Sequence, residues 1–341
     1  MATKIAVLGD GAMGTACALH LAQRPGRQVV LWSAREENGR LLQQHRENLR
    51  LLPGIPIPPA VFLTMDLSEA LRAADLIIWA VPTVYLRATL SPWSSLLRQV
   101  ATPAVSVAKG IEVGTFRRPS EIILELTGPR PLAVMSGPGH AEEIARGLPT
   151  SLVVASSDAD LARQTQTLFS DHRFRLYTNA DLVGVEIAGA LKNVIALAAG
   201  ISDGLGFGDN AKAALLTRAL VEMVRFGEAH GGRRATFFGL AGIGDLITTC
   251  VSPHGRNRAV GIRLGRGEPL ADILASMRQV AEGVYTTRSV HDRTQALGLE
   301  MPISTAVYQV LYENKPALQA VQDLMLRDLK SEWDERRLPQ A

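Results

Sequence analysis

Short apolar runs alternate with longer amphipathic segments along the first half of the chain. The apolar runs are rich in Val, Ile and Leu, and they cover residues 4–9, 28–33, 75–81, 104–108, 132–136 and 151–156. Continuous apolar runs of this length are typical of strands buried on both faces, and intervening helical segments provide the crossovers that parallel strands need. The pattern therefore predicts an α/β fold with a mostly parallel, doubly wound sheet.

The second half of the chain has a different pattern, in which apolar residues recur at helical spacing. Helix-like stretches cover residues 180–200, 210–229, 241–250, 256–266, 282–297 and 302–313, with Gly and Pro between them. A chain of 341 residues is about twice the length of a typical domain. We therefore expect a dinucleotide-binding sheet domain at residues 1–178, for the reasons given below, and an all-α domain at residues 179–341.

Composition narrows the functional classes. Hydrophobic residues make up 47% of the chain and charged residues 20%, and a formal net charge of +3 is too small to predict a nucleic-acid surface. Cys17 and Cys250 are the two cysteines, and neither has metal-ligand spacing, so we expect no metal site and no disulfide. The apolar runs are too short to span a membrane, and a strand pattern begins at once, so we expect a cytoplasmic protein without membrane insertion.

The first predicted strand leads into a glycine-rich turn. VLGDGAMGTACALHLA places Gly9, Gly11 and Gly14 in the spacing GxGxxG between a strand and an apolar helix. Gly9 permits a tight turn, Gly11 lets the backbone approach a pyrophosphate, and Gly14 lets helix and strand pack closely. The helix N-terminus then faces the phosphates. The turn predicts a dinucleotide site, and the alternative is a tight corner without a ligand.

The end of the second strand bears on the choice of dinucleotide. NAD-selective domains usually place an Asp or Glu about 20 residues after the glycines, where it binds the ribose hydroxyls. The sequence VVLWSARE has no carboxylate at the strand tip, and Arg35 can pair with a 2′-phosphate. We therefore expect NADPH in preference to NADH, with NADH still open. The alternative for Arg35 is a solvated position at a helix start.

Two further strand ends carry candidate ligand contacts. Lys109 follows a buried strand in SVAKGIE, and Gly137 and Gly139 follow the next one in VMSGPGHAEE. Ligands of doubly wound sheets bind at the carboxyl edge of the strands. We expect these residues at that edge of the site, although a lysine at a strand exit can also be simply solvated.

One charged residue, Lys192, lies in the middle of the most apolar helix, GVEIAGALKNVIALAAG. Val185, Gly189 and Ala196 share its helical stripe, so small residues leave room for a ligand or another helix. An isolated ammonium is costly to bury, so Lys192 should be exposed, paired or shifted in pKa. This indicates a functional lysine, unless the helix is less buried than its composition suggests.

Two glycine-containing turns in the second half bring polar residues to helix starts. GLAGIGDLITTC delivers Asp245, and on its own an Asp at a helix start is most often a cap. SPHGRNRAVG presents Gly255, Arg256 and Asn257 where a helix begins. Backbone N–H groups, a guanidinium and an amide at a helix N-terminus favour an anion site over an exposed basic helix start.

These motifs occur in the same order in a known family. VLGDGAMGTA, NLRLLPG, AKGIE, SGPGHAEE, GALKN, GLAGIGDLITTC, GRNRAVG and EGVYTT resemble the bacterial-type NAD(P)-dependent glycerol-3-phosphate dehydrogenases, over nearly the whole chain. The resemblance implies a Rossmann domain joined to a helical domain of the 6-phosphogluconate dehydrogenase type. It also implies reversible reduction of dihydroxyacetone phosphate to sn-glycerol 3-phosphate, at the head of phospholipid synthesis.

The resemblance further implies residue roles. Lys192 corresponds to the family's proton donor and acceptor, and Lys109 and Arg256 are the cations expected to lower its pKa. The implied substrate-binding residues are Lys109, Gly137, Gly139, Lys192, Asp245, Gly255, Arg256 and Asn257. The implied cofactor-binding residues are Gly9, Gly11, Ala12, Met13, Gly14, Arg35, Lys109, Ala141, Arg256, Val280 and Glu282. At Ala12, Met13, Gly139 and Gly255 the chain departs from the family pattern, so we expect backbone rather than side-chain contacts there.

Two other functions are open from the sequence. Another NADPH-dependent two-domain reductase, of the ketopantoate or 3-hydroxyacid type, would act on a carboxylate substrate without this phosphate, and the GRN helix start argues against it. A non-catalytic NAD(P)H sensor is opposed by the presence of Lys192 and the anion site. A homodimer fits this class of protein, although the sequence does not fix the oligomeric state.

Overall fold

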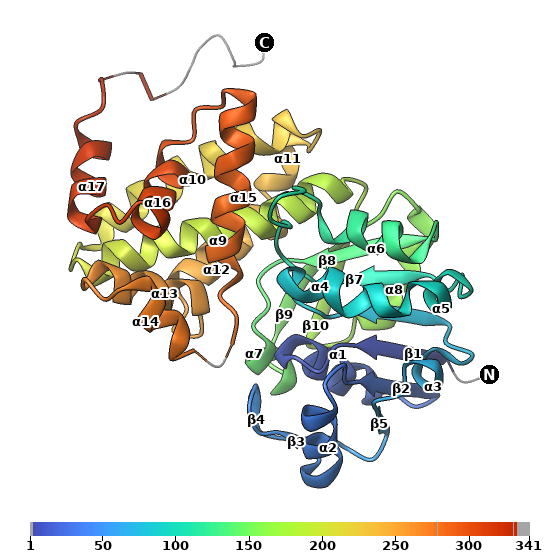
Figure 1. Cartoon of the computed structure of the whole chain (residues 1–341). Helices are drawn as coiled ribbons and strands as arrows, with labels where there is room; N and C mark the ends of the chain where they lie inside the picture. Colours follow the sequence, from blue (N-terminus) through green and yellow to red (C-terminus); the bar gives the residue numbers. More distant parts are fainter. Residues whose placement is uncertain (1–2, 278, 330, 333–341) are drawn as a thin grey trace.

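The computed structural model describes residues 3–277, 279–329 and 331–332. They form a part built on a sheet and a part built of helices (Figure 1). The main sheet has eight strands in the order β10-β9-β8-β7-β6-β1-β2-β5. Its strands are β1 (Thr3–Leu8), β2 (Arg27–Trp32), β5 (Val61–Thr64), β6 (Leu76–Trp79), β7 (Ala104–Ser106), β8 (Leu132–Ser136), β9 (Thr150–Ala155) and β10 (Phe174–Asn179).

The sheet is doubly wound and mostly parallel, as predicted, with one reversal of direction. β9 pairs antiparallel with β8, and β10 runs parallel to β9, so the last two strands oppose the other six. The six predicted apolar runs correspond to β1, β2, β6, β7, β8 and β9. The edge strands β5 and β10 were not predicted. β10 alternates buried Phe174 and Leu176 with exposed Arg175 and Tyr177, so it lacks a continuous apolar run.

Helices cover both faces of this sheet. Successive residues of a strand face opposite sides. Ile5 and Val7 of β1 therefore contribute to one apolar layer, and Ala6 and Leu8 contribute to the other. The helices of this part are α1 (Ala12–Ala22), α2 (Glu36–His45), α3 (Leu67–Leu71), α4 (Thr83–Leu90), α5 (Ser94–Arg98), α6 (Pro119–Thr127), α7 (Ala141–Ala145) and α8 (Ala159–Phe169), with a 3-10 turn η1 (Ser91–Trp93). A separate antiparallel pair joins β3 (Glu47–Asn48) to β4 (Leu52–Pro56).

The second part is helical. It contains α9 (Leu182–Gly204), α10 (Asp209–Ala229), α11 (Arg234–Phe237), the π-helical turn η2 (Leu240–Gly244), α12 (Asp245–Val251), α13 (Arg256–Gly265), α14 (Leu270–Ala275), α15 (Glu282–Leu297), α16 (Pro302–Tyr312) and α17 (Ala317–Met325). The six predicted helical stretches correspond to α9, α10, η2 with α12, α13, α15 and α16, whereas α11, α14 and α17 were not predicted. The division at residues 178 and 179 stays a prediction, and residues 333–341 lie outside the described residues.

The helix α9 lies along the middle of the helical part (Figure 1). By length and composition alone it could cross a membrane, as could a bent pair made by Arg234–Val251 and Arg256–Gly265. However, 89% of the apolar window of α9 is buried inside the protein. This burial is that of a core helix, and it follows from a sequence that is apolar on every side.

Glycines bring α13 into direct backbone contact with α9. A Cβ on Gly200 would lie 2.1 Å from the carbonyl oxygen of Arg258, and a Cβ on Gly261 would lie 2.2 Å from that of Leu197. Gly204 and Gly265 make a similar contact one turn further along. Because no side chain separates the two helices here, the position of the α13 N-terminus is fixed relative to α9.

Candidate active site

Two lysines share one buried carboxylate where the two parts meet. Lys192 Nζ, from α9, donates to Asp245 Oδ1 at 2.6 Å and to Thr249 Oγ1 at 2.7 Å. Lys109 Nζ, from the loop after β7, donates to Asp245 Oδ2 at 2.7 Å and to the carbonyl oxygen of Gly137 at 3.0 Å. The structure thus brings together four of the predicted substrate-site residues, from widely separated segments of the chain.

Burial sets the protonation chemistry of this cluster. Lys192 is 7% exposed and Asp245 is 1% exposed. Burial lowers the pKa of Lys192 to about 8, and Lys109 lowers it too, while Asp245 acts in the opposite direction. Burial alone would raise the pKa of Asp245, but the charges and hydrogen bonds of Lys109 and Lys192 outweigh burial and hold that pKa below its usual value. Lys192 is therefore an amine that can exchange a proton near neutral pH.

Local backbone features place these side chains. The π-helical turn η2 ends at Gly244 and brings Asp245 to the first position of α12. Such turns are frequent at functional sites. Gly189 lies on the lysine stripe of α9, and a Cβ there would come within 2.8 Å of Ser136 Oγ and 3.6 Å of Lys109 Cγ. The predicted small stripe therefore makes room for Lys109 and for the end of β8.

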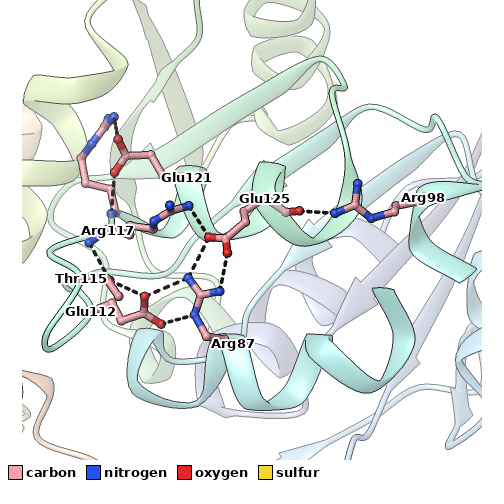
Figure 2. Close-up of polar contacts among 8 residues, drawn as sticks. Arg87, Arg98, Glu112, Thr115, Arg117, Glu121 and Glu125 are labelled. Atoms are coloured by element: carbon pink, nitrogen blue, oxygen red, sulfur yellow. Dashed lines mark hydrogen bonds and ion pairs between the residues drawn. The ribbon is translucent and has the colours of Figure 1, made fainter. Parts of the chain in front are cut away.

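A surface ion-pair network braces the loop that carries Lys109 (Figure 2). Arg87 of α4 pairs with Glu112 of that loop at 2.8 Å and with Glu125 of α6 at 2.9 Å. Arg117 also pairs with Glu125, and Arg98 donates to the backbone carbonyl of Glu125 at 2.6 Å. Several charges acting together hold a geometry better than an isolated exposed pair does. The network thereby ties Glu112 and Arg117 of the loop to α4 and α6.

The predicted anion site lies at the start of α13. Gly255 is its N-cap residue, Arg256 is exposed and Asn257 is buried. Asn257 Oδ1 accepts a hydrogen bond from the backbone N–H of Gly283 at 3.0 Å. Its carbonyl oxygen is therefore used within the protein, and its NH2 group is the part that can face an anion.

Glu282 connects this region to the sheet part. Its Oε1 accepts a hydrogen bond from the backbone N–H of Thr83, the first residue of α4, at 2.7 Å. Burial raises the pKa of Glu282, and Arg256 and the bond from Thr83 oppose that effect. Glu282 and Arg256 are thus close enough to interact, and they lie where α15 and α13 begin.

The glycine turn has the backbone geometry that a dinucleotide needs. Gly9 has a φ of +119°, and a Cβ there would meet the backbone carbon of Ala80 at 2.8 Å. A Cβ on Gly14 would lie 1.9 Å from the carbonyl oxygen of Gly9, so helix and strand are in direct contact. A Cβ on Gly11 would have only the Ala80 carbonyl oxygen within 4.0 Å, so the space over the α1 N-terminus is open. These residues fit a bound pyrophosphate.

The other predicted positions lie in turns or at helix starts, and all of them except Val280 belong to the sheet part. Ala12 and Met13 are the first two residues of α1, and Ala141 is the buried first residue of α7. Gly139 is half-buried in the turn before α7, and Val280 is half-buried two residues before α15. Arg35 is the exposed N-cap residue of α2, with its guanidinium 5.8 Å from the ring centroid of Tyr85. The site roles of all these residues remain predictions.

One further residue in this region was not singled out from the sequence. His140 is the N-cap residue of α7, and its Nε2 is buried without a hydrogen-bond partner among the described residues. Its ring centroid lies 5.8 Å from that of His254, next to the anion site. Burial, followed by the charge of Lys192, lowers the pKa of His140 and favours a neutral ring. The sequence SGPGH gives no sign that His140 belongs to the site, because His254 and Lys192 come near it only in the folded protein.

Metal ligands are a separate question. Within the part of the chain that the structure describes, no group of three or more His, Cys, Asp or Glu residues is arranged to hold a metal ion. Cys17 and Cys250 are buried free thiols.

A glycine turn at the carboxyl edge of a doubly wound sheet, together with a buried ion-paired lysine on the neighbouring helical part, is typical of a nicotinamide-dependent oxidoreductase. The chain belongs to the NAD-dependent glycerol-3-phosphate dehydrogenase family. The model of the family's N-terminus matches residues 4–162, and the model of its C-terminus matches residues 181–322.

Individual relatives agree with this assignment. The chain is 48% identical to a glycerol-3-phosphate dehydrogenase [NAD(P)+] of Pelodictyon phaeoclathratiforme, over 97% of this chain and 99% of that protein. It is 49% identical to the protein of the same name from Chlorobium luteolum, with the same coverage. The crystal structure of glycerol-3-phosphate dehydrogenase from Coxiella burnetii has a TM-score of 0.91 and 38% identity, covering 96% of this chain and 99% of that one.

Proposed function

We propose that this protein interconverts dihydroxyacetone phosphate and sn-glycerol 3-phosphate in the cytoplasm, with a reduced or oxidised nicotinamide dinucleotide, and supplies glycerol 3-phosphate for phospholipid synthesis. The observation that carries the proposal is the buried ion-paired cluster of Lys192, Asp245 and Lys109. A ketone reductase needs a proton donor for the carbonyl oxygen, and Lys192, with a pKa near 8, is suited to that task. Family membership supports the same substrate.

Lys192 moves the proton in this proposal. A dinucleotide held by its pyrophosphate at the glycine turn would supply the hydride for reduction from its nicotinamide and would accept it in oxidation. In reduction, the Lys192 ammonium polarises the ketone and then donates a proton from Nζ to its oxygen. In oxidation, the neutral amine takes the proton from the hydroxyl group. The residues Gly9, Gly11, Ala12, Met13 and Gly14 hold the pyrophosphate through the turn and the α1 N-terminus.

Asp245 orients Lys192 in this proposal. An aspartate at this position can either bind a substrate hydroxyl or orient the lysine. One carboxylate oxygen accepts from Lys192 and the other from Lys109, so both oxygens already have ammonium partners. Lys109 and Asp245 together hold the amine at a fixed point, which is the positioning that proton transfer requires.

The start of α13 holds the phosphate. Arg256 offers a guanidinium fork, Asn257 offers its NH2 group, and the backbone N–H groups after Gly255 lie at the positive end of the helix. A phosphate fixed there aims the carbonyl group of the same small molecule at the nicotinamide. We also propose the division of the chain at residues 178 and 179 and a homodimer, which light scattering of the purified protein would measure.

The assay that tests the function follows oxidation of NADH and NADPH by near-ultraviolet absorbance, with dihydroxyacetone phosphate as the substrate. We expect turnover with this ketone and none with ketopantoate. Lys192→Ala should lower kcat by about 10²–10⁴-fold, because the general acid is lost. Dinucleotide binding, read from nicotinamide fluorescence, should stay near the wild-type value.

The matched control is Lys315→Ala, which removes a lysine paired with Asp323 on the helical part. This control should keep the wild-type kcat. Retained turnover in Lys192→Ala would eliminate Lys192 as the acid. Turnover with ketopantoate instead of the phosphorylated ketone would overturn the proposed substrate.

A further inference from the structure

In the structure a carboxylate from the glycine turn lies beside the end of β2, where β2 itself ends without an acidic residue. Asp10, inside the glycine turn, accepts a hydrogen bond on Oδ2 from Ser33 Oγ at 2.9 Å. Ser33 is the buried residue that directly follows β2. Residues at this strand end face the adenosine ribose in dinucleotide-binding sheets. The carboxylate of Asp10 therefore lies where the adenosine ribose is expected, although it comes from the glycine turn and not from β2.

The position of Asp10 is fixed on two sides. Asn48 Nδ2 donates to the backbone carbonyl of Asp10 at 2.8 Å and to Thr15 Oγ1 at 2.9 Å. The backbone N–H of Ser33 donates to the carbonyl of Thr64 at 3.0 Å, so the hydrogen-bond donor to Asp10 is itself held by the sheet. Asn48 thus holds the backbone of Asp10, and Ser33 holds its carboxylate.

We propose that Asp10 selects against the 2′-phosphate of NADPH and makes NADH the preferred dinucleotide of this chain. The inference rests on the proposed function, because it concerns the dinucleotide of that same reaction. An anchored carboxylate accepts hydrogen bonds from the ribose hydroxyls of NADH. The 2′-phosphate of NADPH instead brings a charge of about −1.5 to −2 close to this carboxylate, and the two negative groups repel each other.

Arg35 is the cation that could favour NADPH, and Asp10 competes for it. Burial raises the pKa of Asp10, and the bond from Ser33 and the charge of Arg35 both lower it, so Arg35 is close enough to act on this carboxylate. Part of the charge of Arg35 is thus balanced within the protein. The expectation of NADPH was based on the lack of a carboxylate at the end of β2. In the folded protein, the side chain of Asp10 places a carboxylate at that position.

The test compares dissociation constants for NADH and NADPH, from fluorescence titrations without ketone, in the full-length wild type and in Asp10→Asn. We expect the wild type to bind NADH at least tenfold more tightly than NADPH. Asparagine keeps the size of the side chain and can still accept from Ser33, so the fold should persist. Asp10→Asn should shift the ratio of the two constants at least tenfold towards NADPH, and the ratio of kcat/KM values should shift likewise.

Two variants complete the experiment. Asp10→Ala removes charge and acceptor together, so it should shift the ratio in the same direction. The control Asp292→Asn makes the same charge change at an exposed position on α15 and should leave the ratio unchanged. Tighter binding of NADPH by the wild type, or an unchanged ratio in both Asp10 variants, would overturn the inference. Failure of the proposed function looks different, since both dinucleotides would then bind without ketone-dependent oxidation.

Discussion

Lys192 and Lys109 both pair with the buried carboxylate of Asp245; Lys192 is buried and Lys109 is partly exposed. The cluster has an excess positive charge, which suits a phosphorylated substrate and the negative charge that develops on a carbonyl oxygen during reduction. Removing Asp245 would leave the buried Lys192 ammonium without its counter-charge, which is costly. At the scale of single residues, the chemistry therefore depends on one carboxylate being shared.

The lowered pKa of Lys192 gives opposite pH dependences for the two directions of the reaction. Reduction needs the ammonium, so its kcat/KM, which reports groups of the free enzyme, should fall as the pH rises through about 8. Oxidation needs the neutral amine, so its kcat/KM should rise through the same pH. Rate profiles measured in both directions check this. In Lys192→Arg the guanidinium stays protonated, so a surviving transition near pH 8 in that variant would contradict the assignment.

Arg256 should act on the phosphate and little on the rest of the substrate. A hydrogen bond to a charged group is worth about 1.5–3 kcal/mol, so Arg256→Ala should raise KM for dihydroxyacetone phosphate roughly 10- to 150-fold. Steady-state kinetics with dihydroxyacetone, which has no phosphate, provide the comparison. An equal loss of kcat/KM with that ketone would remove Arg256 from the phosphate site.

Single residues were predictable where their type was out of place. Lys192 attracted attention because it interrupts an apolar helix. Asp245 on its own was read as a cap, but in the structure its side chain caps nothing and binds two lysines. Asp10 and His140 gave no signal, because their significance depends on Ser33 and Lys192, which only folding brings near them.

At the scale of elements, the backbone contact between α9 and α13 places the anion site. Gly261→Ala should destabilise the protein by about 1–3 kcal/mol, because its Cβ would lie 2.2 Å from a main-chain carbonyl oxygen that cannot move aside. We also expect a higher KM for the phosphorylated ketone, since α13 carries Arg256 at its start. Urea unfolding and steady-state kinetics measure the two effects.

The control for this substitution is Gly208→Ala. Gly208 precedes α10 with a negative φ, and an added Cβ there meets nothing within 4 Å. We expect its stability to stay within about 0.5 kcal/mol of the wild type. A Gly261→Ala protein as stable as this control would show that the two helices can separate without cost.

Elements were predictable where burial is uniform. The central strands and the long helices each bury enough side chains to leave a continuous or periodic pattern, so their positions were found closely. The edge strands β10 and β5 each expose part of their length, with Phe62 of β5 at 48% exposure, so neither leaves a continuous buried run. The helix α11 has four residues, which is too short for a helical period to show. The reversal between β8 and β9 has no sequence signal, because either direction buries the same residues.

At the scale of the whole molecule, the site exists only when the two parts are packed together. Lys109 and Gly137 come from the sheet part, and Lys192 and Asp245 come from the helical part. Glu186 of α9 also links them, since it accepts from the backbone N–H of Ser120 at 2.8 Å and pairs with Arg118 at 2.9 Å. Glu186, the fifth residue of α9, thus anchors the start of α6.

Glu186→Gln should weaken this link. The substitution leaves Arg118 without its buried partner, so we expect a loss of about 1–3 kcal/mol in the free energy of unfolding, with activity lost in step. Chemical denaturation followed by both fluorescence and activity measures it. Glu36→Gln, which removes an isolated exposed pair with Arg40 on α2, is the control and should cost less than about 1 kcal/mol. A Glu186→Gln protein as stable as this control would contradict the anchoring role.

The most enclosed helix of the protein, α9, carries the acid–base amine at its centre. Local unfolding of the helices packed around α9 would therefore also disrupt the position of Lys192. Heat inactivation and the loss of the near-ultraviolet circular dichroism signal should therefore follow one curve. The residual activity after a heat pulse would then measure the fraction of molecules that have regained their native packing.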